Sequence, residues 1–173
     1  MLAISFRFPA GRYHANPWGR HVNEADLDWP PSPWRLLRAL VAVWHRKTDQ
    51  ERFPEVLLSG LLERLGERLP FYSLPAAIHA HSRHYMPSPE KKTLVFDAFA
   101  RISPEDSLVV AWQEVEIPEE EKHLLEYLLE RLSYLGRAES WVEAKLCGEC
   151  PEDVEFNCAP VEEEERIRWD GRL

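Results

Sequence analysis

Two repeating patterns alternate along the chain, and their order limits the folds available to it. Residues 2–8 (LAISFRF) place larger apolar side chains at every second position, which is the period of a half-buried β-strand. Residues 118–136 (PEEEKHLLEYLLERLSYLG) place leucines at helical spacing, with acidic residues in the first turn and Gly136 at the C-terminal stop. Strand-like and helix-like segments in one chain indicate a mixed α+β protein.

Five more segments extend these patterns. They are helices at 32–47 and 54–69 and strands at 93–102, 107–115 and 140–146. The helix at 32–47 has Ser32 as N-cap and Pro33 at its first position. The segments 93–102 and 107–115 are separated only by SPED, which predicts that they form a hairpin.

The order of these elements is typical of a ferredoxin-like fold. With the second helix and the segment after it set aside, the order is βαββαβ, which RNA-recognition domains also use. The extra residues lie between the first helix and the expected second core strand. A chain of 173 residues with 45% hydrophobic content can bury one core, so we expect a single domain with an insertion.

Several features indicate a cytoplasmic protein. The chain contains no run near the roughly 20 apolar residues that cross a bilayer. Residues 1–12 (MLAISFRFPAGR) lack the basic segment and long apolar stretch of a signal peptide. The cysteines, Cys147, Cys150 and Cys158, are too few and too clustered for a disulfide framework. A zinc knuckle would need a fourth ligand at the usual spacing, so we favour free thiols and expect no metal or other cofactor.

Charge is distributed unevenly along the chain. The net charge of −9 by itself argues against a nucleic-acid partner. Residues 1–102, however, hold 14 Lys and Arg against 10 Asp and Glu, whereas residues 103–173 hold 7 against 20. An anion could therefore meet the first part of the chain while the acidic second part faces water or a basic protein.

The segment 78–87 (IHAHSRHYMP) concentrates polar chemistry. In an extended segment, His79, His81, Arg83 and Tyr85 share one face. The opposite face ends with His84 and begins apolar, as if packed on the protein. Four interpretations stay open: a metal site, which Arg83 would oppose; a metal-free ribonuclease centre; an arm that holds RNA together with Lys91 and Lys92; and a surface hairpin with incidental histidines.

Basic and aromatic residues also interleave in residues 10–21 (AGRYHANPWGRH). They are Arg12, Tyr13, His14, Trp18, Arg20 and His21. Such a mixture suits single-stranded RNA, because cations follow the phosphates while rings stack on bases. The alternative is that Tyr13 and Trp18 simply pack on the core. In the following helix, Arg35 and Arg38 share a face, and the helix N-terminus is a weak phosphate-site signal.

Long stretches of the chain resemble a known family. Residues 1–46, SRHYMP with KKTLVFDAFARI, YLGRAESWVEAKL and NCAP are similar to the N-terminal half of the fused CRISPR-associated protein of type I-U (I-G) systems, in the RAMP superfamily. That fusion joins a Cas-five-type subunit, which holds the five-prime handle of the guide RNA, to a Cas-six-type repeat endonuclease. The resemblance covers nearly all of residues 1–160.

The resemblance implies a ferredoxin-like palm at 1–160 with an inserted β-hairpin thumb at about 70–92, followed by an acidic tail or linker at 161–173. It implies contact with CRISPR RNA and with the backbone and large subunits of the effector complex. The implied RNA-binding residues are Arg12, Tyr13, His14, Arg20, His21, Arg35, Arg38, His79, His81, Arg83, His84, Tyr85, Lys91, Lys92 and Arg137.

The resemblance does not assign catalysis to these residues. The family continues into its endonuclease half where this sequence ends, so we expect no repeat cleavage from residues 1–173 and no catalytic residue. Some stand-alone Cas-five-type proteins cut repeats with Tyr, Lys and His side chains. Tyr13, His14 and Lys91 keep a metal-independent endoribonuclease open as the alternative function.

Overall fold

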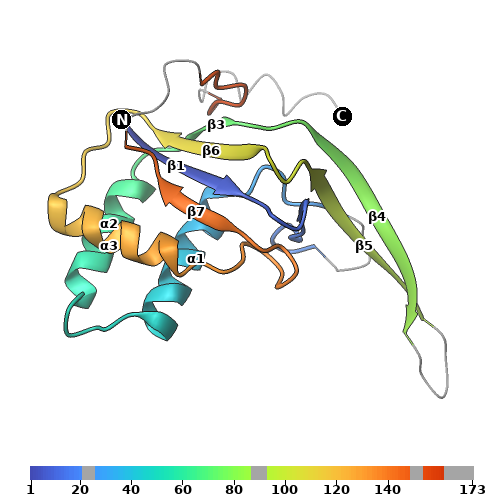
Figure 1. The fold of residues 1–173 in the computed structure, drawn as a ribbon, viewed down its shortest axis with the longest axis horizontal. Coiled ribbons are helices and arrows are strands. Elements are labelled where there is room, and N and C mark those ends of the chain that lie inside the picture. The colour runs from blue at the N-terminus through green and yellow to red at the C-terminus, as the bar shows by residue number, and fades with distance from the viewer. Residues whose placement is uncertain (21–25, 87–92, 149–153, 162–173) are drawn as a thin grey trace.

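The computed structural model describes residues 1–20, 26–86, 93–148 and 154–161. They form a mixed α+β structure with three helices and two antiparallel sheets (Figure 1). The elements are β1 (Leu2–Arg7), β2 (Arg12–Tyr13), α1 (Pro33–Lys47), α2 (Glu55–Gly66), β3 (Phe71–Ser73), β4 (Ala77–Met86), β5 (Thr93–Ile102), β6 (Ser107–Trp112), α3 (Glu119–Glu130) and β7 (Glu143–Leu146).

The larger sheet has the strand order β3-β6-β1-β7, and the smaller has the order β2-β5-β4. β1, one of the two inner strands of the larger sheet, faces the helices. Ile4 and Phe6 border a small interior gap together with Leu36 of α1 and Leu129 of α3. All four side chains are buried. The main core therefore lies between the four-stranded sheet and its helices.

Local sequence explains where the helices lie. Pro33 stands at the start of α1, where a missing N–H is harmless, and the buried face of α1 contains Leu40 and Trp44. Three glutamates occupy the first turn of α3, where they complement the helix dipole. Of the described helices, none is long and apolar enough to span a bilayer.

The prediction that residues 93–102 and 107–115 form a hairpin with each other is wrong. β5 pairs with β4 along its whole length, from Ala77 opposite Ile102 to Met86 opposite Thr93, whereas β6 belongs to the other sheet. In chain order, the second strand of the four-stranded sheet is β3, which lies between Pro70 and Pro75 and pairs with β6. The short polar link SPED turns the chain from one sheet into the other.

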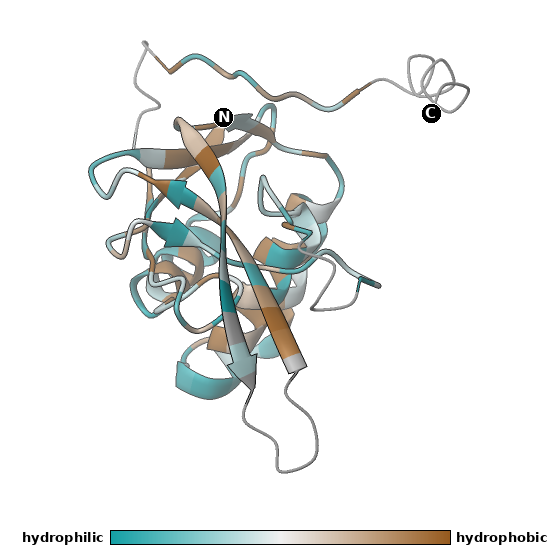
Figure 2. Cartoon of the chain, turned by 90° about the vertical axis from the view of Figure 1, so that its right-hand side faces the viewer, coloured by the Kyte–Doolittle hydropathy of each residue, from teal (hydrophilic) through white to brown (hydrophobic). Residues whose placement is uncertain are grey.

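The inserted hairpin therefore lies between β3 and β6, and not directly before residue 93. It consists of β4 and β5, so it extends beyond the expected range of 70–92. In Figure 1 it projects away from the rest of the molecule, and in Figure 2 its two strands differ in hydropathy along their length. Its base joins the body where Ala98, Ala100 and Ile102 are buried.

Two boundaries in the second half differ from the pattern. α3 ends at Glu130, so Gly136 lies six residues beyond the end of the helix, in a turn with φ +88°. The last strand begins at Glu143, and the residues before it make a single bridge between Tyr134 and Trp141. The chain after α3 thus folds back on itself before it rejoins the sheet.

Candidate functional site

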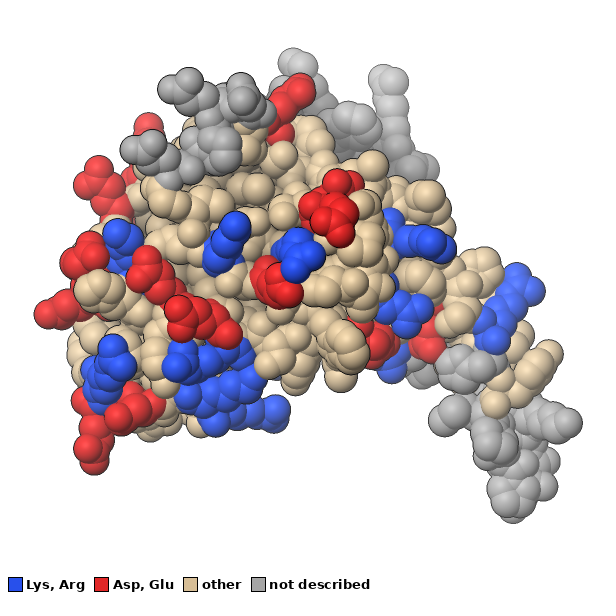
Figure 3. Space-filling view, viewed as in Figure 1, with Lys and Arg blue, Asp and Glu red and all other residues tan. Residues whose placement is uncertain are grey.

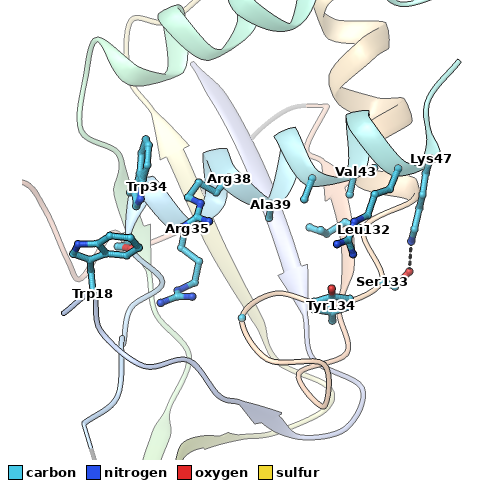
Figure 4. A pocket seen from close by; sticks show the side chains of 14 residues that line it. Trp18, Trp34, Arg35, Arg38, Ala39, Val43, Lys47, Leu132, Ser133 and Tyr134 are labelled. Carbon is cyan, nitrogen blue, oxygen red and sulfur yellow. Dashed lines mark hydrogen bonds between the residues drawn. The ribbon is translucent and has the colours of Figure 1, made fainter. Parts of the chain in front are cut away.

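A pocket of about 310 Å³ opens between α1 and the chain that follows α3. Basic and aromatic side chains mark its lining, and within the described parts of the chain no Asp or Glu lines it. The basic members are Arg35, Arg38, Arg46 and Lys47, and the aromatic members are Trp18, Trp34 and Tyr134. In Figure 4, Trp18 and Trp34 lie side by side at one end and Lys47 lies at the other.

Helical spacing places these groups in one row. Trp34, Arg38, Ala42 and Arg46 follow one another at intervals of four residues on α1. Residues four apart are neighbours on a helix surface, so the row forms one wall of the pocket. Ala42 and its neighbour in the next row, Ala39, are small, and this leaves room between the long side chains.

Two of the four cations are held by the protein itself. Arg35 donates through Nε to Asp28 Oδ2 at 2.6 Å. Lys47 donates through Nζ to the carbonyl oxygen of Arg131 and to Ser133 Oγ, both at 2.7 Å. The Lys47 contacts connect the end of α1 to the opposite wall of the pocket. Arg35 and Lys47 therefore shape the pocket more than they offer free charge.

The other two cations are free of carboxylates. Arg38 and Arg46 make no ion pair with any Asp or Glu that the structure describes. The guanidinium carbon of Arg38 lies 5.8 Å from the ring centroid of Trp18 and 6.0 Å from that of Trp34. Both indoles are exposed, at 84% for Trp18 and 61% for Trp34. Cations and open ring faces thus lie together at one place on the surface.

The β4–β5 hairpin presents a second polar surface. Strand register sets His79, His81, Arg83 and Tyr85 opposite residues of β5 on one shared face. Within this face the Arg83 guanidinium carbon lies 5.2 Å from the ring centroid of Phe96, and the His81 ring centroid lies 6.2 Å from it. The four side chains are exposed. Figure 3 shows Lys and Arg on the hairpin and in a cluster at the helical end of the molecule, where Asp and Glu also lie.

The opposite face of β4 is not packed on the protein, contrary to the expectation. Ile78, which begins that face, is 68% exposed. The reason is that the hairpin leaves the body of the molecule at this level. On the face of the hairpin that carries His79 and His81, the buried residues are Ala98 and Ala100 of β5.

Tyr13 is a core residue. Its side chain is fully buried, and its ring centroid lies 5.6 Å from those of Phe8 and Trp29. Burial raises the pKa of its phenol far above the usual value. Its hydroxyl has no hydrogen-bond partner in the described structure. Tyr13 is therefore not accessible to RNA in this conformation.

His14 is also buried, at 2% exposure, and it organises a polar network. Its Nδ1 lies 2.7 Å from Glu139 Oε1, and its Nε2 lies 3.3 Å from Arg137 Nη1. Because a guanidinium can only donate, Nε2 accepts and Nδ1 carries the proton. Arg137 also donates to Asp97 Oδ1 of β5 at 3.0 Å. His14 and Arg137 thus connect the base of the hairpin to the chain after α3, and His14 is not accessible to RNA.

Charge and hydrogen bonding in this network act on Glu139. Partial burial alone would raise the pKa of its carboxyl group. Hydrogen bonds from its own backbone N–H and from His14, together with nearby positive charge, outweigh burial and lower that pKa below its usual value. The carboxylate form is therefore favoured in the folded protein.

The remaining expected RNA-binding residues are dispersed. Arg12 stacks its guanidinium carbon 4.3 Å from the Phe99 ring centroid, on the hairpin's other face. Arg20 is exposed and lies 3.4 Å from a carboxylate oxygen of Asp26. Outside the described residues lie His21, Lys91 and Lys92, and of His84 only the backbone, in β4, is described.

Five of the basic and aromatic residues of the pocket are absent from the predicted RNA-binding residues: Trp18, Trp34, Arg46, Lys47 and Tyr134. A spacing signal existed for two of them, because Trp34 and Arg46 lie four before and eight after Arg38 on an acid-free helix. No local pattern relates Tyr134 to α1, since the contact depends on the fold-back after α3. Only the tertiary structure brings it to the pocket.

The cysteines show no metal cluster in the part of the chain that can be described. Cys147 and Cys158 are half-buried thiols, and Cys150 lies outside the described residues. Among described residues, no group of three His, Cys, Asp or Glu side chains is arranged to hold a metal ion.

Similarity to known proteins does not decide what these surfaces bind. No protein-family model matches the chain, and no curated protein matches it.

Proposed function

We propose that this protein is an RNA-binding subunit of a type I-U (I-G) CRISPR effector complex, in which it holds the five-prime handle of the guide RNA. The observation that carries the proposal is the exposed β4–β5 hairpin, which bears His79, His81, Arg83 and Tyr85 on one face. A projecting arm with cations, hydrogen-bond donors and an open aromatic ring suits single-stranded RNA.

The arrangement of the body supports the proposal. We assign it a ferredoxin-like palm made of β1, α1, β3, β6, α3 and β7. The sheet order β3-β6-β1-β7 is the second, third, first and fourth strand of that βαββαβ unit, with every neighbouring pair antiparallel. In this assignment α2 and the hairpin are insertions, and the hairpin is the thumb. The effector's backbone and large subunits are the proposed protein partners.

A salt-dependent binding assay tests the proposal. The repeat-derived handle, labelled with fluorescein, is titrated with the protein at several salt concentrations. We expect the logarithm of the association constant to fall linearly with the logarithm of the salt concentration. Each phosphate contact should add about −0.7 to the slope of this plot. The double variant Arg83→Ala with Tyr85→Ala should lose roughly tenfold or more in affinity, because it removes one stacking ring and one cation.

Arg68→Ala is the charge-matched control, because Arg68 is exposed, pairs with Glu114 and lies outside both surfaces. The proposal fails if the handle binds no better than an unrelated oligonucleotide and shows no salt slope. If the hairpin variant keeps full RNA affinity while assembly with partner subunits is lost, the hairpin is a protein-docking arm instead.

The alternative, a metal-independent endoribonuclease, has no specific observation in its favour. Tyr13 and His14 are almost completely buried. His14 has both ring nitrogens engaged, with Glu139 and Arg137. Lys91 lies outside the described residues. Neither described side chain can reach a substrate in this conformation, so we do not propose cleavage.

A further inference from the structure

We propose that the pocket between α1 and residues 132–136 binds one unpaired nucleotide, with its base against the indoles of Trp18 and Trp34 and its phosphate at Arg38 and Arg46. The inference rests on the proposed RNA binding and adds a second contact surface to the hairpin. It names the class of ligand, a nucleoside phosphate, for a pocket of about 310 Å³.

Charge is the first argument. A helix C-terminus favours basic residues in its last turn, which accounts for Arg46 and Lys47 without any ligand. That explanation does not reach Arg38, which lies in the middle of α1. Arg38 and Arg46 stand on one row, unpaired with any described carboxylate, and α1 itself contains no Asp or Glu. Both guanidiniums line one pocket, and a phosphate bound there would be attracted to them and would accept their hydrogen bonds.

Aromatic exposure is the second argument. An indole that is 84% exposed gains little from burial in the folded chain, yet Trp18 lies directly beside Trp34 and Arg38. Tyr134, at 42% exposure, contributes a third ring to the same pocket. Base stacking is tolerant of base identity, because every base has a π-face. The pocket is therefore suited to a nucleotide with any of the bases.

Size and rigidity are the third argument. The volume lies at the lower end of the roughly 300–1,000 Å³ typical of ligand pockets, which suits a single nucleotide better than a duplex. The pocket is also held open by the protein, since Lys47 bridges its two walls and Arg35 is fixed by Asp28. A pocket formed in advance loses less entropy when the ligand binds.

The experiment fills the pocket without removing charge. Ala42 is exposed on α1, so Ala42→Leu keeps a strong helix former and places extra carbon atoms where the ligand would lie. The probe is a fluorescein-labelled oligo(A) of about ten nucleotides. We expect Ala42→Leu and Trp34→Ala each to weaken binding about tenfold, with an unchanged melting temperature. Arg68→Ala is the charge control, and Ala159→Leu, at an exposed position outside the pocket, is the size control. Both should stay within twofold.

Adenosine monophosphate and adenosine, added as competitors, identify the source of the ligand. Displacement of oligo(A) by the monophosphate but not by adenosine supports a site for a free nucleotide or a strand end. If pocket variants weaken oligo(A) binding but neither competitor displaces it, the pocket binds a nucleotide within a strand, which also supports the inference.

The inference is overturned if Ala42→Leu and Trp34→Ala bind oligo(A) as the controls do, and also if they lose only partner assembly. The proposed function fails in a different way, namely if the unaltered protein binds neither handle nor oligo(A). In that case direct titration with adenosine monophosphate tests the inference by itself. The inference is overturned if the monophosphate does not bind, or if Ala42→Leu binds it equally well.

Discussion

His14 shows at the scale of single residues that chemical type does not determine role. In the sequence it stands among Arg12, Tyr13 and Trp18, and this mixture predicts an RNA-binding loop. In the structure His14 points inward, where Ser140 Oγ accepts a hydrogen bond from its backbone N–H at 2.8 Å. Trp18 points outward and is 84% exposed. His14 is held by a partner more than 120 residues away in the sequence. Local composition therefore could not show which of these neighbouring residues is buried.

Gly136 packs against the same backbone, and this leads to the first prediction. Its φ of +88° is unfavourable for any other residue, and an added Cβ would lie 2.5 Å from the His14 carbonyl oxygen. Gly136→Ala should lower the free energy of unfolding by about 2 kcal/mol or more, from the left-handed conformation and the clash together. Urea unfolding followed by circular dichroism measures the change.

Gly66→Ala is the matched control for this substitution. Gly66 ends α2, and an added Cβ would meet only a Leu37 methyl carbon, at 4.0 Å. The variant should be neutral or about 0.5–1 kcal/mol more stable. Equal losses in both variants would contradict the assigned role of Gly136.

At the scale of elements, helices were predictable and strand partners were not. Pro33 and the leucine spacing set α1 and α3, because helix formation depends on neighbours within four residues. β3 is only three residues long, and its pairing with β6 connects residues far apart in sequence. The pairing of β5 with β4 rather than with β6 depends on the same long-range choice. Periodicity assigns residues to faces but does not choose between partners.

The hairpin supports the second prediction. Replacing residues 84–95 by Asn-Gly joins Arg83 to Phe96, which are directly opposite in register. The four-stranded sheet and its core contain none of the removed residues. We therefore expect the melting temperature to fall by no more than a few degrees. Affinity for the handle should fall at least tenfold, because Tyr85 and the removed cations are lost.

Thermal unfolding and fluorescence anisotropy measure these two effects on one protein sample. Complete unfolding of the shortened variant would show that the hairpin is part of the folding core. Full retention of affinity would show that its outer half does not contact RNA.

At the scale of the whole molecule, one polar network joins parts of the chain that belong to different sheets. His14 follows β2, Asp97 belongs to β5, and Arg137 with Glu139 follows α3. Residue identities indicated a basic, histidine-rich surface in this region. They could not indicate that Arg137 faces inward to Asp97 and His14, because this orientation depends on the fold-back that ends at β7.

The network predicts a pH dependence of stability. The pKa of Glu139 is lower in the folded protein than its ordinary value of 4.5, so its contribution is complete above that value. It is lost as pH falls through the lowered pKa. Glu139→Gln keeps an acceptor for His14 Nδ1 but removes the charge. We expect it to reduce the free energy of unfolding at pH 7 by a few tenths to about 1 kcal/mol.

Urea unfolding from pH 7 to about pH 3 measures the difference between the two proteins, which should shrink at the acid end. Glu116→Gln is the control, because Glu116 is exposed and makes no ion pair that the described structure contains. A difference that stays constant over the whole range would contradict the role of the Glu139 charge.

The attachment of the hairpin has a mechanical consequence. Its base is fixed by β2, by buried alanines of β5 and by the Arg137–Asp97 contact. Farther out, the described residues of β4 are exposed on both faces and those of β5 are half-buried. The hairpin therefore has the properties of a cantilever, a beam clamped at one end. A force applied near its free end should bend the two strands and leave the clamped end in place, so movement of a ligand bound there would be absorbed before it could distort the four-stranded sheet.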